Sequence, residues 1–154
     1  MTDYHLPPSL QEHEAAISAW LAGFAAQNPA FEALDRGEPG EPEPRWYVRL
    51  SGEEKEHLTI WFTLGQRTLR YEVYVLPAPP ENAAAVYELA LRRNDKLVGA
   101  HFAIGVEDAL FLRGEVPLAW LTEAELDRII GSLYSYTERA FPALVRLAFA
   151  SKFD

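Results

Sequence analysis

Three runs of the chain alternate between apolar side chains and more polar ones, which is the period of a β-strand with one buried face. The runs cover residues 45–50, 57–64 and 69–76, and short polar turns at Ser51–Lys55 and Gly65–Thr68 separate them. Because such turns reverse the chain, we predict an antiparallel meander with one apolar face. The positions predicted to form that face are Trp46, Val48, Leu50, Leu58, Ile60, Phe62, Leu64, Leu69, Tyr71, Val73 and Val75.

An amphipathic helix is predicted before the meander. Ser9 precedes Glu12 by three residues, the spacing of a capping box, and an apolar stripe then continues to the residues before Pro29. The following segment, Asp35–Pro44, carries three prolines and two glycines among acidic residues. Such a segment forms neither helix nor sheet ladder, so we predict an exposed connector.

The rest of the chain is predicted to form a helix, two strands and a last helix. The second helix starts at the prolines of residues 77–80 and ends at Arg93 or Asn94. Two short strands follow in residues 98–105 and 109–117. The last helix begins at Thr122, and Pro142 is expected to kink or break it near residues 137–138. The order α-β-β-β-α-β-β-α indicates an α+β fold with helices on an antiparallel sheet, in a single domain over residues 1–154.

Composition excludes several kinds of function. The chain has no cysteine, so disulfides, thiolate zinc sites and a cysteine nucleophile are excluded. The net charge is −9, and residues 1–44 hold −7 of it, from eight acidic side chains against Arg36. This balance disfavours nucleic acid and anionic membranes as partners. No apolar run approaches the ~18 residues of a membrane span, and the first residues lack the features of a leader, so we expect a cytoplasmic protein.

The stretch Arg92–Gly105 contains the residues most suggestive of catalysis. Asp95 could orient His101 as a general base, but six residues of extended strand span ~20 Å, so the two side chains cannot meet locally. Gly99, Ala103 and Gly105 are small, so a helix of the same chain or a second subunit could approach the strand closely.

No other pattern of catalysis or ligation is found. The histidines lack the spacing of a metal site, and no phosphate-binding loop or nucleophile elbow occurs. We therefore predict no catalytic residues, no metal and no cofactor. The histidines are His5, His13, His57 and His101.

The face of the meander opposite to the core is the strongest candidate for binding. It carries Tyr47, Trp61 and Tyr74 among Arg45, Arg49, Arg70 and Thr59, and Trp, Tyr and Arg dominate binding hot spots. Alternatively, a helix or the acidic connector covers this face. A further alternative is an RNA-stacking platform, which the acidic charge disfavours.

The order of the elements and the stretch LALRRNDKLVGAHFAIGVEDALFLRGEVPLAWLTEAELDRIIGSLYSYTE resemble the bacterial YbjN family. The similar features are Asn94 after the helix, the apolar alternation at Ala100, Phe102 and Ile104, and the strand that leads to Thr122. Similarity covers most of the chain and is densest over residues 89–136. That family in turn resembles the type III secretion chaperones.

The resemblance implies an intracellular, non-catalytic protein that forms a homodimer and binds other proteins. Members of the family are described as sensory-transduction or stress regulators, and chaperones of this fold hold extended segments of client proteins. The expected function is therefore chaperone-like or regulatory binding of a protein or peptide client. The alternative is a small-molecule sensor or an enzyme with a cleft near His101, and RNA binding is a minor alternative.

Overall fold

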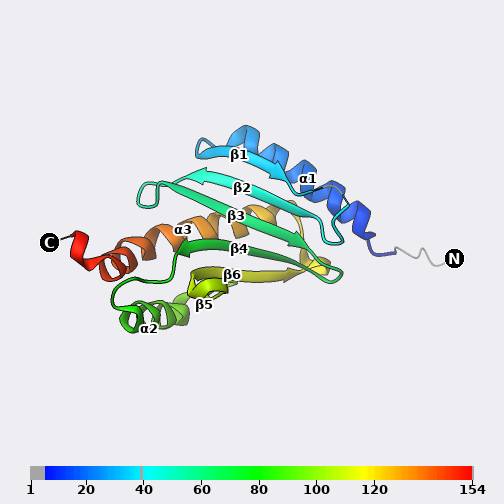
Figure 1. Cartoon of the computed structure of the whole chain (residues 1–154). Helices are drawn as coiled ribbons and strands as arrows, with labels where there is room; N and C mark the ends of the chain where they lie inside the picture. Colours follow the sequence, from blue (N-terminus) through cyan, green and yellow to red (C-terminus); the bar gives the residue numbers. More distant parts are fainter. Residues whose placement is uncertain (1–5, 39, 154) are drawn as a thin grey trace.

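Residues 6–38 and 40–153 are described in a computed structural model, and in this part of the chain a six-stranded antiparallel sheet packs against three α-helices (Figure 1). The predicted α+β class is confirmed, and the predicted helices and strands are present in the predicted order, with one strand that was not predicted, Phe31–Arg36, before the meander. The strand order across the sheet is β1-β2-β3-β4-β6-β5. The elements are α1 (Leu10–Gln27), β1 (Phe31–Arg36), β2 (Arg45–Ser51), β3 (His57–Leu64), β4 (Thr68–Leu76), α2 (Ala83–Arg93), β5 (His101–Ile104), β6 (Leu110–Pro117) and α3 (Glu123–Ala148).

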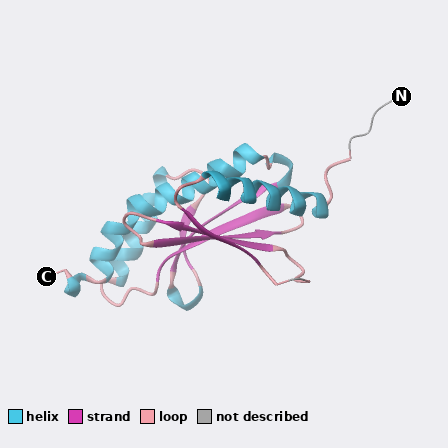
Figure 2. Cartoon of the chain, turned by 90° about the horizontal axis from the view of Figure 1, so that it is seen from above, coloured by secondary structure: helices cyan, strands magenta, loops and turns pink. Residues whose placement is uncertain are grey.

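The core lies between one face of the sheet and the α-helices, which Figure 2 shows on the same side of the strands. All positions predicted to form the apolar face of the meander are buried, with at most 3 % of their surface exposed. Ile17 and Leu21 of α1, Val86 of α2 and Leu133 of α3 join them in one cluster. Because the helices are confined to this side, the opposite face of the meander lies outside the core.

Two of the helices begin as the capping pattern predicts. The Ser9 hydroxyl accepts the backbone N–H of Glu12 at 3.1 Å, and the Thr122 hydroxyl accepts that of Glu125 at 3.1 Å. The second helix differs, because it begins at Ala83, after the prolines, and Asn82 before it adopts a left-handed conformation with φ 53°. The Asn82 side chain instead donates to the Leu147 carbonyl at the end of α3.

Of the predicted kink or break at Pro142, the break is wrong. Helix α3 continues from Glu123 to Ala148 with Pro142 inside it. Proline removes one backbone donor, so the carbonyl four residues earlier loses its helical partner. Ala140, Leu144 and Ala148 around it are buried in the core, and burial of this apolar stripe offsets the missing hydrogen bond.

The connector is shorter than predicted, because its first two residues are part of a strand. Asp35 and Arg36 end β1 and pair with Tyr47 and Trp46 of β2. The register shifts between Phe31 and Ala33, and the burial along the strand does not alternate. Strand β1 is therefore an irregular edge strand, which explains why its sequence does not show the period of two.

The strand predicted over residues 98–105 is shorter in the structure. Strand β5 covers His101–Ile104, with Phe102 buried and Ile104 exposed. The Phe102 N–H donates to the Asn94 side-chain oxygen at 2.7 Å, and the Asn94 side-chain N–H donates to the Phe102 carbonyl at 3.2 Å. Asn94 follows α2 directly, so this side chain joins the end of the helix to the edge of the sheet.

Candidate functional site

Cross-strand pairing aligns five side chains in one row on the sheet face opposite to the helices. Tyr47 pairs with Trp61, and Trp61 pairs with Glu72. Glu72 pairs with Arg113, and Arg113 pairs with His101. Directly paired residues of antiparallel strands project to the same face of the sheet. All five therefore project from one surface, which we call the outer face, and the two candidate regions of the sequence lie on it together.

Two edge-to-face aromatic pairs form the apolar part of the outer face. The rings of Tyr47 and Trp61 lie 5.7 Å apart at 85°, and those of Tyr74 and Phe111 lie 5.5 Å apart at 88°. Trp61 and Tyr74 are each 42 % exposed, whereas Phe111 is buried. Phe111 therefore supports Tyr74 from below, and the two exposed rings are available to a partner.

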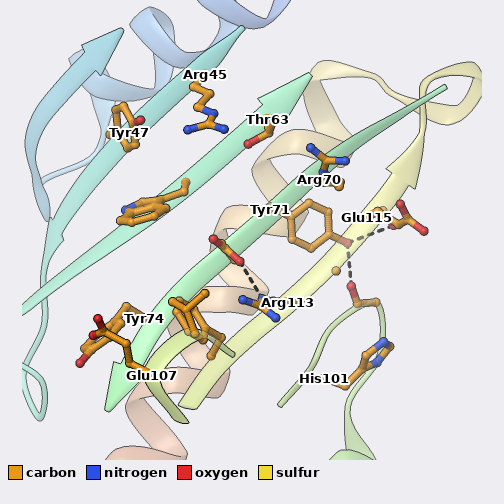
Figure 3. Close-up of a pocket in the computed structure, with 16 residues that line it drawn as sticks. Arg45, Tyr47, Thr63, Arg70, Tyr71, Tyr74, His101, Glu107, Arg113 and Glu115 are labelled. Atoms are coloured by element: carbon orange, nitrogen blue, oxygen red, sulfur yellow. Dashed lines mark hydrogen bonds and ion pairs between the residues drawn. The ribbon is translucent and has the colours of Figure 1, made fainter. Parts of the chain in front are cut away.

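A groove of about 960 Å³ runs over the outer face, open to solvent (Figure 3). Strands β2, β3, β4 and β6 form its floor, and the η2 turn (Val106–Asp108) borders one end through Val106 and Glu107. The close-up shows Glu107 beside Tyr74 at that end, while Arg45 and Arg70 lie at the other. The groove thus has an aromatic middle and ends of different charge.

The predicted arginines are on the outer face, but each has a carboxylate partner within the chain. Arg49 pairs with Glu32 at 2.9 Å. Arg45 lies 3.8 Å from Glu41 of the connector. The acidic connector thus reaches the rim of the groove, as the alternative interpretation expected, but Trp61 and Tyr74 remain exposed.

Arg113 in the middle of the groove was not predicted. Its guanidinium pairs with Glu72 at 2.7 Å and lies 4.3 Å from the centre of the Phe111 ring. These contacts fix Arg113 and neutralise the centre of the groove. The alternation of Phe111, Arg113 and Glu115 against Leu110 and Leu112 is the sequence signal that places them on the outer face.

His101 lines the groove, but its surroundings do not resemble a catalytic site. It begins β5, whereas Asp95 belongs to the η1 turn (Asn94–Lys96) after α2. The residue that could orient His101 as a general base therefore lies on another element, and the cross-strand partner of His101 is Arg113. The neighbouring small residue Gly105 is explained by the chain itself, because a Cβ there would lie 2.5 Å from the Phe111 ring and 2.6 Å from Arg113.

Tyr71 is a further groove residue that the sequence did not indicate. Its ring packs over Gly114, where a Cβ would lie 2.6 Å away, and its hydroxyl donates to the Gly99 carbonyl at 2.6 Å. Burial raises the pKa of the Tyr71 hydroxyl, against the opposing effect of the nearby Arg128 charge. A neutral hydroxyl that already donates a hydrogen bond is a structural support of the groove and a poor acid.

The described part of the chain offers no group of three or more carboxylate and histidine side chains close enough to hold a metal ion. His5 lies outside the described residues. None of the described helices is both long and apolar enough to cross a membrane.

Comparison with known proteins gives the family. The uncharacterized protein Rv0487 of Mycobacterium tuberculosis is 32 % identical over 113 residues, covering 73 % of this chain and 62 % of the relative. The uncharacterized protein ML2442 of Mycobacterium leprae is 29 % identical over 107 residues, covering 70 % of this chain and 58 % of the relative. The chain thus spans about three fifths of the length of the curated relatives it matches.

The family model that matches covers residues 17–146, and its description is "Putative bacterial sensory transduction regulator". The matched residues include every strand of the sheet and most of α1 and α3. The resemblance to type III secretion chaperones stays a prediction. The match over this length shows that the chain belongs to the YbjN family.

Proposed function

We propose that the outer face binds an extended segment of a partner protein, and that this non-catalytic binding serves a regulatory role. The observation that carries the proposal is the pair of exposed rings, Trp61 and Tyr74, in a groove on the face that the α-helices leave uncovered. Large aromatic side chains that a fold holds at the surface are typical of binding hot spots. Regulation through a bound protein agrees with the description of the family.

The shape of the groove favours an extended segment. Its two ends lie near Arg70 and Tyr74 of the same strand, β4, so a bound chain can run along that strand and contact several side chains in turn. Tyr47 and Phe111 hold Trp61 and Tyr74 through edge-to-face contacts. Because these rings are already ordered, the protein loses little conformational freedom when a partner binds.

A small-molecule sensor is the second candidate, favoured by the volume of the groove. About 960 Å³ lies within the range of small-ligand sites, and the exposed His101 is available as a polar partner. RNA binding is disfavoured, because the chain has a net charge of −9, and recruitment of a phosphate backbone needs clustered basic side chains.

The test is a comparison of partner recovery by three proteins from a lysate of the native host. The proteins are the wild type, the double variant Trp61→Ala/Tyr74→Ala, and the control Trp120→Ala. Trp120 is 72 % exposed and lies outside the groove, in the η3 turn (Leu118–Trp120). Light scattering first measures the oligomeric mass of each, since we expect a homodimer.

We expect mass spectrometry to find a protein that the wild type and Trp120→Ala recover and the groove variant loses. Overlapping synthetic peptides of that protein should then contain a segment that binds the wild type directly. Equal recovery by the folded groove variant contradicts the proposal. In that case a thermal-shift screen with small molecules tests the sensor hypothesis, since ligand binding to the folded state raises the melting temperature.

A further inference from the structure

Two glutamates of the connector form ion pairs with arginines at one end of the groove. Glu43 pairs with Arg70 at 2.9 Å, and Glu41 lies 3.8 Å from Arg45. Arg45 and Arg70 belong to β2 and β4, and both line the groove. An acidic, proline-rich stretch of the chain thus supplies the carboxylates that a bound segment would otherwise supply.

The contact between Glu41 and Arg45 is poorly made. At 3.8 Å the two groups are too far apart for a hydrogen bond. The Oε2 atom of Glu41 is shielded from solvent, and no hydrogen-bond partner for it occurs among the described residues. A buried carboxylate oxygen without a hydrogen-bond partner destabilises the docked position of Glu41, so little free energy is needed to release this segment from the groove.

The charges along the groove give a bound segment a direction. Glu72 and Arg113 neutralise each other in the middle at 2.7 Å. Glu115 is the cross-strand partner of Arg70, so once the connector leaves, Arg45 and Arg70 together outweigh Glu115 and give this end a net positive charge, while Glu107 at the opposite end is negative. Carboxylates of a partner are therefore attracted to the end of the groove that holds Arg45 and Arg70.

The spacing along β4 fixes where an apolar side chain of the partner would lie. Arg70 and Tyr74 project to the same face four residues apart, which is ~13 Å along a strand. A partner segment that runs along β4 in extended form would place an apolar residue about four positions from its carboxylate.

We infer that the groove takes an extended acidic peptide with an apolar residue about four positions from the acid, and that Glu41 and Glu43 are an internal competitor for it. This inference rests on the proposed function, because it names the kind of segment that the same groove binds. Glu41 and Glu43 stay paired with Arg45 and Arg70 until better-placed carboxylates of a partner displace them. Two surface ion pairs are weak enough to be exchanged in this way.

The test uses a fluorescein-labelled synthetic peptide that carries two glutamates, three spacer residues, and then leucine and phenylalanine. A control peptide has glutamines in place of the glutamates. Fluorescence anisotropy measures the binding of each to the wild type, to Glu41→Gln/Glu43→Gln and to Arg45→Gln/Arg70→Gln. These side chains lie at the surface or are partly exposed, and thermal melting checks that the variants fold.

We expect the acidic peptide to bind Glu41→Gln/Glu43→Gln roughly two- to tenfold more tightly than the wild type, because two competing surface pairs are removed. The variant Arg45→Gln/Arg70→Gln should bind more weakly, and added salt should weaken binding to the wild type. No gain on removal of the two glutamates, or no binding to that variant, overturns the inference.

The two proposals fail in different ways. If both peptides bind the wild type equally and Trp61→Ala/Tyr74→Ala loses both, the groove binds peptides without a preference for acid, and only the present inference is wrong. If Trp61→Ala/Tyr74→Ala binds the acidic peptide as the wild type does, the site lies elsewhere and the proposed function fails as well.

Discussion

The side-chain amide of Asn94 is hydrogen-bonded to both backbone polar groups of Phe102, at 2.7 Å and 3.2 Å. These are the groups that β5 presents on the side away from β6, so the amide takes the place of a neighbouring strand. An uncovered strand edge is a site of pairing with other chains. Asn94 therefore has two effects, on the stability of the sheet end and on its tendency to self-associate.

Asn94→Ala should lower the free energy of unfolding by about 1–3 kcal/mol, because it leaves a part-buried N–H and C=O without partners. Urea unfolding measures this loss, with Asp95→Ala as a control at the exposed neighbouring position. Light scattering of Asn94→Ala should also show more self-association. A variant as stable and as monodisperse as the control contradicts this role of Asn94.

Glu138 should be the acidic residue of α3 whose neutralisation costs most stability. Its carboxylate accepts backbone N–H groups from Glu53, Glu54 and Lys55 in the β2–β3 turn, at 3.1, 2.7 and 3.4 Å. Hydrogen bonds to a charged acceptor are stronger than those to a neutral one. Glu138→Gln should therefore lower the free energy of unfolding by about 1–3 kcal/mol in urea titration.

The matched control for Glu138 is Glu88→Gln, since Glu88 is exposed and its ion-pair partner among the described residues is Arg92 on its own helix, at 3.6 Å. It should change stability by less than about 0.5 kcal/mol. A Cβ at Gly52 would overlap both Glu138 and the Lys55 carbonyl, so Gly52→Ala should also destabilise the turn. Equal effects of Glu138→Gln and Glu88→Gln would show that the turn holds without the carboxylate.

The neighbouring strands β2 and β3 each contain a tryptophan, and truncation of the two should destabilise the protein to very different extents. Trp46 is 1 % exposed, and its indole N–H donates to the hydroxyl of Ser18 in α1 at 3.0 Å. Trp46→Ala should cost about 3–5 kcal/mol of unfolding free energy. Trp61→Ala on the outer face should cost less than about 1 kcal/mol.

Tryptophan fluorescence during urea unfolding reads both variants. If Trp61→Ala proves as damaging as Trp46→Ala, Trp61 is part of a buried interface, and loss of partner binding by that variant no longer reports on a free surface.

The strands with a strict period of two were predictable from the sequence, and those held by other elements were not. In β2, β3 and β4 every second residue is apolar, because one face of each is covered by helices. Strand β1 lacks this pattern, since it is an irregular edge strand whose Phe31 and Ala33 flank a shift of register. Strand β5 begins only at His101, because Gly99 before it has a left-handed φ of 78° that a strand does not adopt.

The candidate site was predictable strand by strand, but not as a whole. Alternation alone predicted that Tyr47, Trp61 and Tyr74 project away from the core, and the exposure of Trp61 and Tyr74 confirms this. It could not show that Arg113 and His101 join them, since this depends on β6 pairing with β4 and β5 pairing with β6. Such long-range pairing is set by the packing of the whole sheet, which no local pattern specifies.

The Glu125–Arg128 pair should make stability depend on pH in acid. A hydrogen bond from Arg128 lowers the pKa of the Glu125 carboxyl below its ordinary value of 4.5, against a smaller opposing effect of burial. The two contacts measure 3.0 and 2.5 Å. Because the folded state binds the proton less readily than the unfolded state, the stabilisation is fully present above the ordinary pKa and is lost as the pH falls through the lowered one.

Arg128→Gln should remove this contribution, so the wild type should lose more stability than the variant between about pH 6 and about pH 3. The difference should stay under about 1 kcal/mol, since both side chains are partly exposed and solvent screens the pair. Urea unfolding at the two pH values measures it, with Arg139→Gln, at an exposed position of the same helix, as the control. Parallel losses in all three proteins would mean that other carboxyls determine the acid sensitivity of the fold.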